Sequence, residues 1–190
     1  SAVAVVTALS IGLSGAASAD EITVGVIAPF SGPFAIYGKL YQEAIETYVA
    51  QNGTMAGEHE IVFIYKDVGG PNPDQSRSLA QELLIRDQVD YLAGFTFTPN
   101  AFAVAPLIEQ SETPTVIFNA ATSAINTESE FFLRTSFTLW QVTAPFAEWA
   151  YDQGMRTAVT TVTDYGPGID AENAFKAAFE AKGGEVLDQI

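Results

Sequence analysis

The regular alternation of short apolar strands with helices constrains the fold of this chain most strongly. It is clearest in residues 89–122, where a strand at 89–93, a loop at 95–99, a helix at 100–111 and a strand at 115–118 follow one another. The second strand is rich in β-branched residues and too short for a helix. Because the helix returns the chain to the same edge of the sheet, the two strands are expected to be parallel. The sequence therefore predicts an α/β fold built on a parallel sheet.

The same alternation begins close to Glu21. Strands are predicted at 22–28 and 60–66, and Asn72 followed by Pro73 forms a cap and first-turn pair for a further helix. The helix predicted at 39–51 carries one apolar face that should pack against the sheet. Its residues are Leu40, Ala44, Ile45, Tyr48 and Val49.

Beyond Thr122 the pattern is less regular. The predicted elements are a short strand at 131–134, a crossing segment at 135–142, a helix at 143–153, a strand at 157–163, a helix at 169–182 and a strand at 185–190. Two β-α units after residue 142 are too few to close a core of their own. We therefore expect the chain to be truncated at its C-terminal end.

Hydroxyl side chains gather in two loops that leave the carboxyl ends of neighbouring predicted strands. They are Thr96, Thr98, Thr122 and Ser123. In open α/β sheets small ligands bind at this edge, and helix starts there offer free backbone N–H groups to a carboxylate. An alternative is that these residues only cap helices.

The composition excludes several function classes. The net charge is −15 and the pI about 4.1, without a cluster of Lys or Arg, so nucleic acids and anionic lipid surfaces are excluded as partners. The chain has no Cys for disulfides or thiolate catalysis. The single histidine, His59, has no nucleophile elbow near it, and the spacing of Asp67, Asp74 and Asp87 does not indicate a metal site. No enzyme, cofactor or metal centre is predicted.

Residues 1–19 have the character of a secretory signal peptide. They are apolar and rich in small residues, and end in Ala17-Ser18-Ala19 before Asp20. The basic start and the initiating Met are missing, so we expect the N-terminus to be truncated and the mature chain to begin near Asp20. A membrane anchor is less favoured, because the apolar run is shorter than about 20 residues.

An ordered series of short motifs runs through residues 21–190. They are SGPFAIYG at 31–38, Asp67, the segment 73–89, GFTFT at 94–98, NAAT at 119–122, LRT at 133–135 and DYG at 164–166. This series resembles that of the type I periplasmic substrate-binding proteins of ABC importers, in particular the leucine/isoleucine/valine-binding branch.

The resemblance implies a periplasmic binding protein type I fold, with two doubly wound parallel-sheet lobes and a ligand cleft between them. It places the first lobe at 20–135, the hinge at 136–142 and the incomplete second lobe at 143–190. It also implies a monomeric periplasmic protein that delivers a small ligand to the membrane permease of an ABC transporter, without a cofactor. The same fold also serves as a ligand-sensing domain in receptors, and this alternative stays open.

The resemblance implies a ligand site as well. Thr98 and Thr122 correspond to hydroxyls on the ligand carboxylate, and Tyr37 and Tyr165 to aromatic residues that face the ligand from the two lobes. With the backbone positions of the NAAT motif, the implied contacts are Tyr37, Thr98, Ala120, Ala121, Thr122 and Tyr165.

Several residues depart from the amino-acid binders of this family. Phe95 and Phe97 flank Thr96, Trp140 and Phe137 lie in the predicted crossing segment, and Asn119 precedes the Ala-Ala-Thr sequence. Phe95, Phe97, Asn119 and Trp140 are possible pocket-lining residues, and so much aromatic surface suits an aromatic or longer acid. Core packing explains the phenylalanines equally well. The ligand class therefore remains a branched-chain amino acid, an aromatic acid or an amide.

Overall fold

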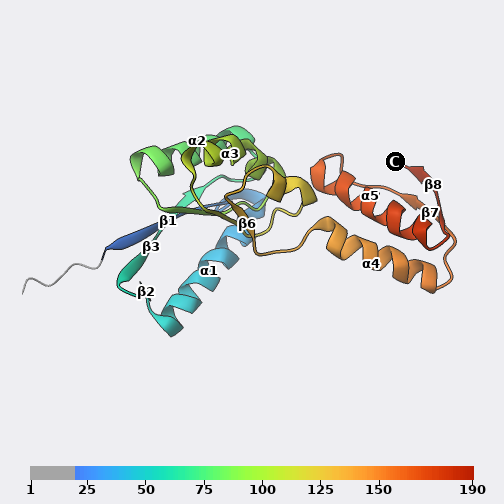
Figure 1. The fold of residues 1–190 in the computed structure, drawn as a ribbon, viewed down its shortest axis with the longest axis horizontal. Coiled ribbons are helices and arrows are strands. Elements are labelled where there is room, and N and C mark those ends of the chain that lie inside the picture. Colours follow the sequence, from blue (N-terminus) through green and yellow to red (C-terminus); the bar gives the residue numbers. More distant parts are fainter. Residues whose placement is uncertain (1–19) are drawn as a thin grey trace, which may run out of the picture.

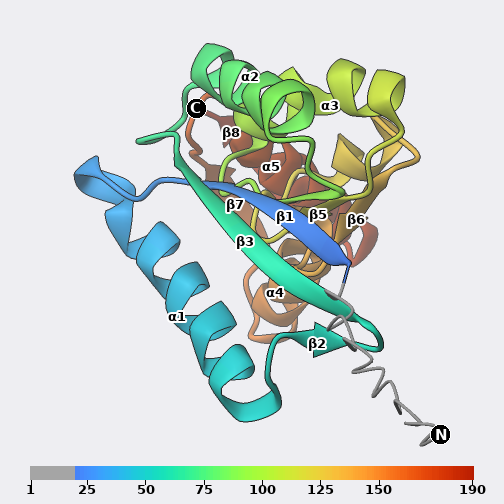
Figure 2. The ribbon, with the colours of Figure 1, turned by 90° about the vertical axis from the view of Figure 1, so that its left-hand side faces the viewer.

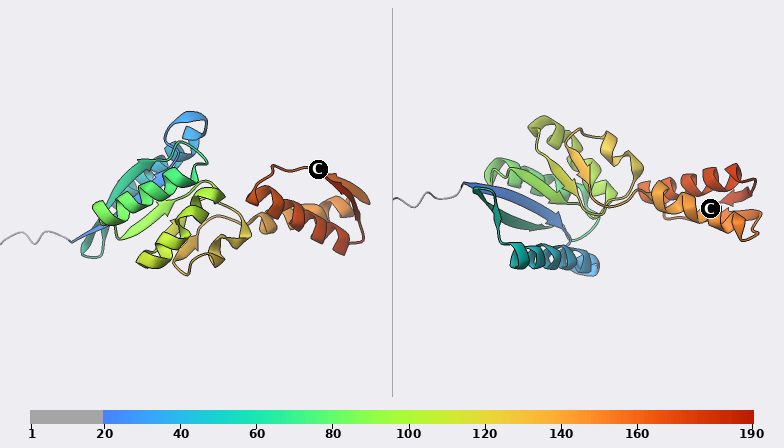
Figure 3. Two further views of the ribbon diagram at one scale, coloured as in Figure 1. Left: turned by 90° about the horizontal axis from the view of Figure 1, so that it is seen from above. Right: turned by 60° about the horizontal axis from the view of Figure 1, so that its bottom comes forward.

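The computed structural model describes residues 20–190, so the predicted signal peptide lies outside the described residues. Figures 1 and 3 show two parts joined by a narrow connection. We call residues 20–134 the first part and residues 139–190 the second part; each contains one sheet. Within the described range, no helix is both long and apolar enough to cross a membrane.

The first part contains a six-stranded sheet in the order β2-β3-β1-β4-β5-β6. Every neighbouring pair is parallel except the edge strand β2, which is antiparallel to β3 and was not predicted. The parallel pairing of the first two predicted strands is confirmed, with Glu21 opposite Glu60 and Ala28 opposite Asp67. The strands are β1 (Glu21–Ala28), β2 (Met55–Ala56), β3 (His59–Asp67), β4 (Tyr91–Gly94), β5 (Thr115–Ile117) and β6 (Phe132–Arg134).

Helices cover both faces of this sheet, as predicted. Helix α1 (Ala35–Asn52) lies on one side, and α2 (Pro73–Gln81) and α3 (Thr98–Ser111) lie on the other (Figure 2). Helix α2 continues as a π-helical turn, Glu82–Arg86. The core lies under α2 and α3, where each fully buried aliphatic side chain contributes about 1.5–3 kcal/mol. Its members include Ile27, Leu83, Leu92, Val104, Ile108 and Ile117.

The apolar face predicted for α1 is not buried. Leu40 is 53% exposed and Tyr48 66% exposed, and Ala44 is exposed as well. Near the start of α1, Gly38 N–H donates to Pro29 O, in the loop after β1, at 3.2 Å. Ile45 and Val49 are half-buried, so the predicted face is only partly covered in residues 20–190.

The second part contains two β-α units around a parallel pair of strands. It consists of α4 (Leu139–Asp152), β7 (Thr157–Thr160), α5 (Gly166–Ala181) and β8 (Glu185–Gln189). Its small core lies between the helices, where Phe179 and Ala147 are fully buried. The Phe175 ring stacks on the Phe179 ring, with 5.3 Å between the ring centroids. The predicted order of elements is confirmed, although β7 ends three residues before the predicted limit at 163.

Helix α4 begins at Leu139, not at the predicted residue 143. The cause is a capping box: Thr138 Oγ1 accepts from Gln141 N–H at 3.1 Å, and Gln141 Oε1 accepts from Thr138 N–H at 2.7 Å. Trp140 therefore lies in the first turn of a helix and not in a crossing strand. The lobe boundaries at 135 and 142 stay a prediction.

Helices α3 and α5 also start earlier than predicted. Pro99 and Pro167 occupy the first turns, a position that proline tolerates because the first helical N–H groups have no intrahelical acceptor. Consequently Thr98 is the first residue of α3, and Gly166 is the first residue of α5. The start of α3 lies in a loop that the sequence indicated as a binding loop, and the start of α5 follows Tyr165, a ligand contact implied by the resemblance.

We expect Gly94→Ala to destabilise the protein strongly. Gly94 has a φ of +110°, and a Cβ there would lie 2.2 Å from Ile27 O. The left-handed backbone and the overpacking together should cost about 2–5 kcal/mol of unfolding free energy in urea titrations. Gly154→Ala is the matched control: its φ is +96° with nothing within 4 Å, so only the backbone cost of about 1–2 kcal/mol applies. Equal losses in the two variants would contradict this account.

Candidate functional site

Two predicted hydroxyls meet at the carboxyl edge of the first sheet. Thr98 Oγ1 lies 3.0 Å from Thr122 Oγ1, and the two residues are 2% and 7% exposed. Thr98 follows β4, and Thr122 follows β5, the next strand in the sheet. The sequence expectation that these two loops come together is therefore confirmed in geometry.

The start of α5 in the second part packs on this pair of hydroxyls. A Cβ on Gly166 would lie 3.3 Å from Thr122 Oγ1 and 3.6 Å from Thr98 Cγ2. The two parts of the chain thus approach each other directly over the threonines. A side chain at position 166 would occupy the space between the start of α5 and the two threonines.

A cavity of about 280 Å³ lies beside the threonine pair. Both parts contribute to its wall, and its volume is close to the lower limit of about 300 Å³ for small-molecule pockets. This is a suitable size for a compact ligand. The lining residues are Tyr37, Thr96, Phe97, Thr98, Asn119, Ala121, Phe137, Leu139, Tyr165 and Pro167.

Aromatic side chains form much of this wall. Phe97 lies edge-on to Phe34 at 4.9 Å and to Tyr37 at 6.3 Å. Phe137 is 47% exposed and Tyr165 39% exposed, so both leave ring surface uncovered. Six of the ten residues suggested by the sequence line the cavity: Tyr37, Phe97, Thr98, Asn119, Ala121 and Tyr165.

Phe95 and Ala120 are placed away from the cavity wall. Phe95 is 1% exposed and belongs to the main core, and its backbone has a positive φ of 60°. The backbone of Ala120 is already engaged: its N–H donates to Phe95 O at 3.1 Å, and its carbonyl accepts from Arg134 at 3.3 Å. Core packing is thus the role that the structure gives to Phe95.

Thr122 and Trp140 are also absent from the lining residues. Thr122 stands behind Thr98 through their shared hydrogen bond. The indole Nε1 of Trp140 donates to Asp170 Oδ1 at 2.9 Å, which directs the ring toward α5. Asp170 was not singled out from the sequence, and its partners lie too far along the chain for any local pattern to indicate them.

Two polar residues of the cavity wall, Asn119 and Thr96, are held by hydrogen bonds. Asn119 Nδ2 donates to Thr96 O at 3.0 Å, and the Thr96 hydroxyl donates to the Tyr41 hydroxyl at 3.3 Å. Burial raises the pKa of Tyr41 above its ordinary value, although the hydrogen bond from Thr96 opposes this, so the phenol stays neutral. These bonds fix the Asn119 amide and the backbone of the Thr96 loop.

Asp67 organises the loop that precedes α1, the helix that carries Tyr37. Its Oδ1 accepts from Phe30 N–H at 2.8 Å, Ser31 N–H at 3.3 Å and Gly69 N–H at 2.8 Å. Burial alone would raise the pKa of Asp67, but the hydrogen bonds from Ser31 and the backbone outweigh it and lower the pKa. The ionised carboxylate therefore holds the β1–α1 loop against the end of β3.

Arg134 places a positive charge behind the threonine loop. Its guanidinium donates to Thr122 O at 2.7 Å and to Ala120 O at 3.3 Å. Burial lowers the pKa of Arg134, and nearby Asp170 opposes that shift, but an arginine remains charged at neutral pH. Arg134 thus fixes the carbonyls of the loop and raises the local potential for an anion.

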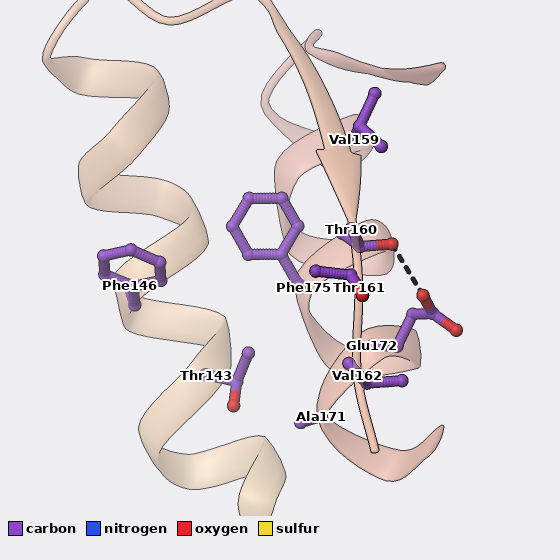
Figure 4. Close-up of a pocket in the computed structure, with 9 residues that line it drawn as sticks. All are labelled: Thr143, Phe146, Val159, Thr160, Thr161, Val162, Ala171, Glu172 and Phe175. Atoms are coloured by element: carbon purple, nitrogen blue, oxygen red, sulfur yellow. Dashed lines mark hydrogen bonds between the residues drawn. The ribbon is translucent and has the colours of Figure 1, made fainter. Parts of the chain in front are cut away.

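A second, larger cavity lies wholly inside the second part (Figure 4). It measures about 360 Å³ and lies between α4 and α5 beside β7, with the rings of Phe146 and Phe175 in its wall. Its carboxylate, Glu172, accepts from the Thr160 hydroxyl at 2.6 Å. This groove contains none of the predicted site residues, and its charge disfavours an anion, so the cavity between the parts is the better candidate.

The described part of the chain contains no group of side chains arranged for metal binding or acid–base chemistry. Between residues 20 and 190, no group of three or more His, Cys, Asp or Glu side chains is arranged to hold a metal ion. His59 is exposed at the start of β3, as the sequence suggested.

Comparison with known families decides the assignment. The family model described as "Periplasmic binding protein" matches residues 21–190. This chain belongs to the periplasmic binding protein family. The type I fold and the recognition made from the sequence motifs are thereby confirmed.

Individual relatives of this family member are solute-binding proteins. The Leu/Ile/Val-binding protein homolog 6 of Brucella abortus is 51% identical over 175 residues, covering 92% of this chain and 45% of its own. A solute-binding protein of an ABC transporter from Rhodopseudomonas palustris HaA2, in complex with p-hydroxybenzoic acid, is 50% identical with a TM-score of 0.87. One from Rhodopseudomonas palustris BisB5, in complex with 3,4-dihydroxybenzoic acid, is 40% identical with a TM-score of 0.86.

The chain spans about half the length of these relatives. The two solved structures are matched over 90% of this chain, but over 46% and 47% of their own. The match therefore covers the cavity residues described above, while the activity of the whole protein is a matter for proposal.

We expect Asp67→Asn to destabilise the β1–α1 loop in a pH-dependent way. The folded-state pKa of Asp67 lies below its unfolded value, so its stabilisation is present above the unfolded pKa and is lost as pH falls through the folded one. Because the carboxylate is partly solvated, the loss at about pH 7 should be only about 1 kcal/mol of unfolding free energy. Urea titrations from about pH 7 to pH 2 should show the difference from the parent narrowing below about pH 5.

The exposed carboxylate of Glu58 in the β2–β3 turn provides the control for this experiment. Glu58→Gln should leave the stability unchanged over the same pH range. A difference between Asp67→Asn and the parent that stays constant down to about pH 2 would show that the charge of Asp67 is not the cause.

Proposed function

We propose that this protein is an extracytoplasmic solute-binding protein that delivers an aromatic carboxylate of the hydroxybenzoate class to the permease of an ABC importer. The observation that carries the proposal is the aromatic wall of the cavity beside the buried Thr98–Thr122 pair. Two relatives of 50% and 40% identity are solute-binding proteins in complex with hydroxylated benzoic acids, which supports it.

The carboxylate of the ligand is assigned to the edge of the first sheet. The hydroxyl of Thr98, which is hydrogen-bonded to the Thr122 hydroxyl, supplies a donor there, together with the backbone at Ala121 and the N-terminal end of α3. Arg134 adds a positive charge behind the loop. Ala120 takes part through the position of its loop, because its N–H and carbonyl are already paired.

The ring of the ligand is assigned to the aromatic residues. Tyr37 and Phe97 cover it from the first part, and Phe137 and Tyr165 from the side of the second part. Aromatic pairs in edge-on or offset geometry contribute about 0.5–1.5 kcal/mol beyond their buried area.

A transport role without catalysis fits these features best. The proposed site holds donors and ring surfaces but no nucleophile with a general base. A ligand-sensing domain of a receptor shares the fold, but the relatives named above are solute-binding proteins, which favours delivery to a permease. We further propose that the protein acts as a monomer in the periplasm.

We expect loss of either threonine hydroxyl to weaken ligand binding. A hydrogen bond to a charged group is worth about 1.5–3 kcal/mol, so Thr98→Val and Thr122→Val should each raise the Kd for 4-hydroxybenzoate roughly ten- to hundredfold. Tyr165→Ala should weaken binding mainly through faster release. Titration calorimetry and stopped-flow measurements on the natural full-length protein test these values.

The matched control for this series is Thr47→Val, on the exposed surface of α1 away from the cavity. It should bind within about twofold of the parent. If both threonine variants also stay within about twofold, the hydroxyls only cap helices. If leucine binds more tightly than 4-hydroxybenzoate, the aromatic ligand class is wrong.

We expect export with cleavage after Ala19. The Ala17-Ser18-Ala19 sequence fits the small-residue pattern that signal peptidase recognises. Mass spectrometry of the natural protein from the periplasmic fraction should give a mature N-terminus at Asp20 or within about two residues of it. An uncleaved chain in the membrane fraction would instead support an anchor.

A further inference from the structure

A single carboxylate connects the two parts of the molecule beside the cavity. Asp170, in the second turn of α5, accepts through Oδ2 from the Ser123 backbone N–H at 3.0 Å and from the Ser123 hydroxyl at 2.8 Å. Its Oδ1 accepts from Trp140 Nε1 at 2.9 Å. We call these three hydrogen bonds the Asp170 contact. Ser123 belongs to the first part, whereas Asp170 and Trp140 belong to the second.

The Asp170 contact fixes the carboxylate in orientation as well as in position. Trp140 holds one oxygen from α4, which directs the other oxygen at Ser123 across the junction of the two parts. Hydrogen bonds to an ionised acceptor are roughly twice as strong as neutral ones, and two of these three use the same oxygen. The indole therefore acts as a support that aims the carboxylate.

The loop that receives this contact is the loop of the proposed site. Ser123 directly follows Thr122, whose hydroxyl pairs with Thr98 and whose carbonyl accepts from Arg134 at 2.7 Å. The loop is thus held by a cation within the first part and by an anion from the second part. Only the interaction with Asp170 depends on how closely the two parts approach.

We propose that Asp170 is a positioning residue that stabilises the closed arrangement of the two parts and holds the Thr122 loop in its binding geometry. This inference rests on the proposed function for its effect on ligands, but not for its effect on closure. Asp170 is not among the residues that line the cavity. It should therefore act on every ligand to the same extent, and should change the release rate more than the association rate.

The closest matched control is Glu172 on the same helix. Its carboxylate also accepts a hydroxyl hydrogen bond, from Thr160 at 2.6 Å, but both residues belong to the second part. Glu172→Gln therefore perturbs a comparable bond without affecting the junction. Asp170→Glu keeps the charge but lengthens the side chain, and should restore part of what Asp170→Ala loses.

The first measurement needs no ligand. The 190 residues contain no Cys, so spin labels can be attached to Glu58→Cys in the first part and Glu180→Cys in the second, both at exposed positions. Pulsed electron paramagnetic resonance on the natural full-length protein then gives the distance distribution between the parts. Asp170→Ala should shift the distribution to longer distances, and Glu172→Gln should not. An unchanged distribution in Asp170→Ala overturns the inference.

The second measurement compares ligands. For Asp170→Ala, we expect release to be about tenfold faster for 4-hydroxybenzoate and for 3,4-dihydroxybenzoate alike, with association within about twofold of the parent. Ser123→Ala and Trp140→Phe should change release in the same direction but less, because each removes one of the three bonds. A change confined to one ligand would make Asp170 a specificity residue and overturn the positioning role. If the parent binds neither acid, the proposed function fails, and the distance measurement still decides the role of Asp170.

Discussion

The register between β4 and β5 determines where the site lies. Gly94 stands opposite Ile117, so both strands end at the same level of the sheet. Pairing continues past the strands, with Phe118 N–H donating to Gly94 O at 2.7 Å. The two following loops therefore run side by side, which brings Thr98 and Thr122 within hydrogen-bond distance. A shift of one residue would turn the following side chains to the opposite face and separate the hydroxyls.

Most elements of the fold could be predicted because hydrophobic periodicity is a local signal. The same signal was not sufficient to locate the first residues of the helices. Helix α4 was placed at residue 143 because the apolar pattern is clear only from there. The reciprocal bonds of Thr138 and Gln141 extend it to Leu139, and they depend on side chains that the apolar pattern ignores. For α1 the pattern correctly indicated a helix, but which side is covered depends on the tertiary arrangement.

The same distinction applies to the candidate site. Thr98 could be located because the end of its strand is readable from the sequence, whereas Tyr37 and Tyr165 were indicated only by the family resemblance. Phe95 and Phe97 could not be separated in this way, because which ring is buried in the core and which lines the cavity depends on the tertiary packing. Asp170 illustrates a stricter limit: its partner Ser123 is 47 residues away, so only the packing of one part on the other reveals the pair.

Because the cavity wall comes from both parts, the proposed ligand would couple binding to closure. Thr98 and Ala121 come from the first part, and Tyr165 and Pro167 from the second. A ligand can shift the equilibrium between open and closed arrangements only by the difference in its interactions with the two. A carboxylate held by the threonine loop alone contacts mostly the first part, whereas a ring that reaches Tyr165 interacts more strongly with the closed form. Under the proposed function, selectivity among carboxylates would arise from the ring, and the Asp170 contact would set how much ring surface is needed for closure.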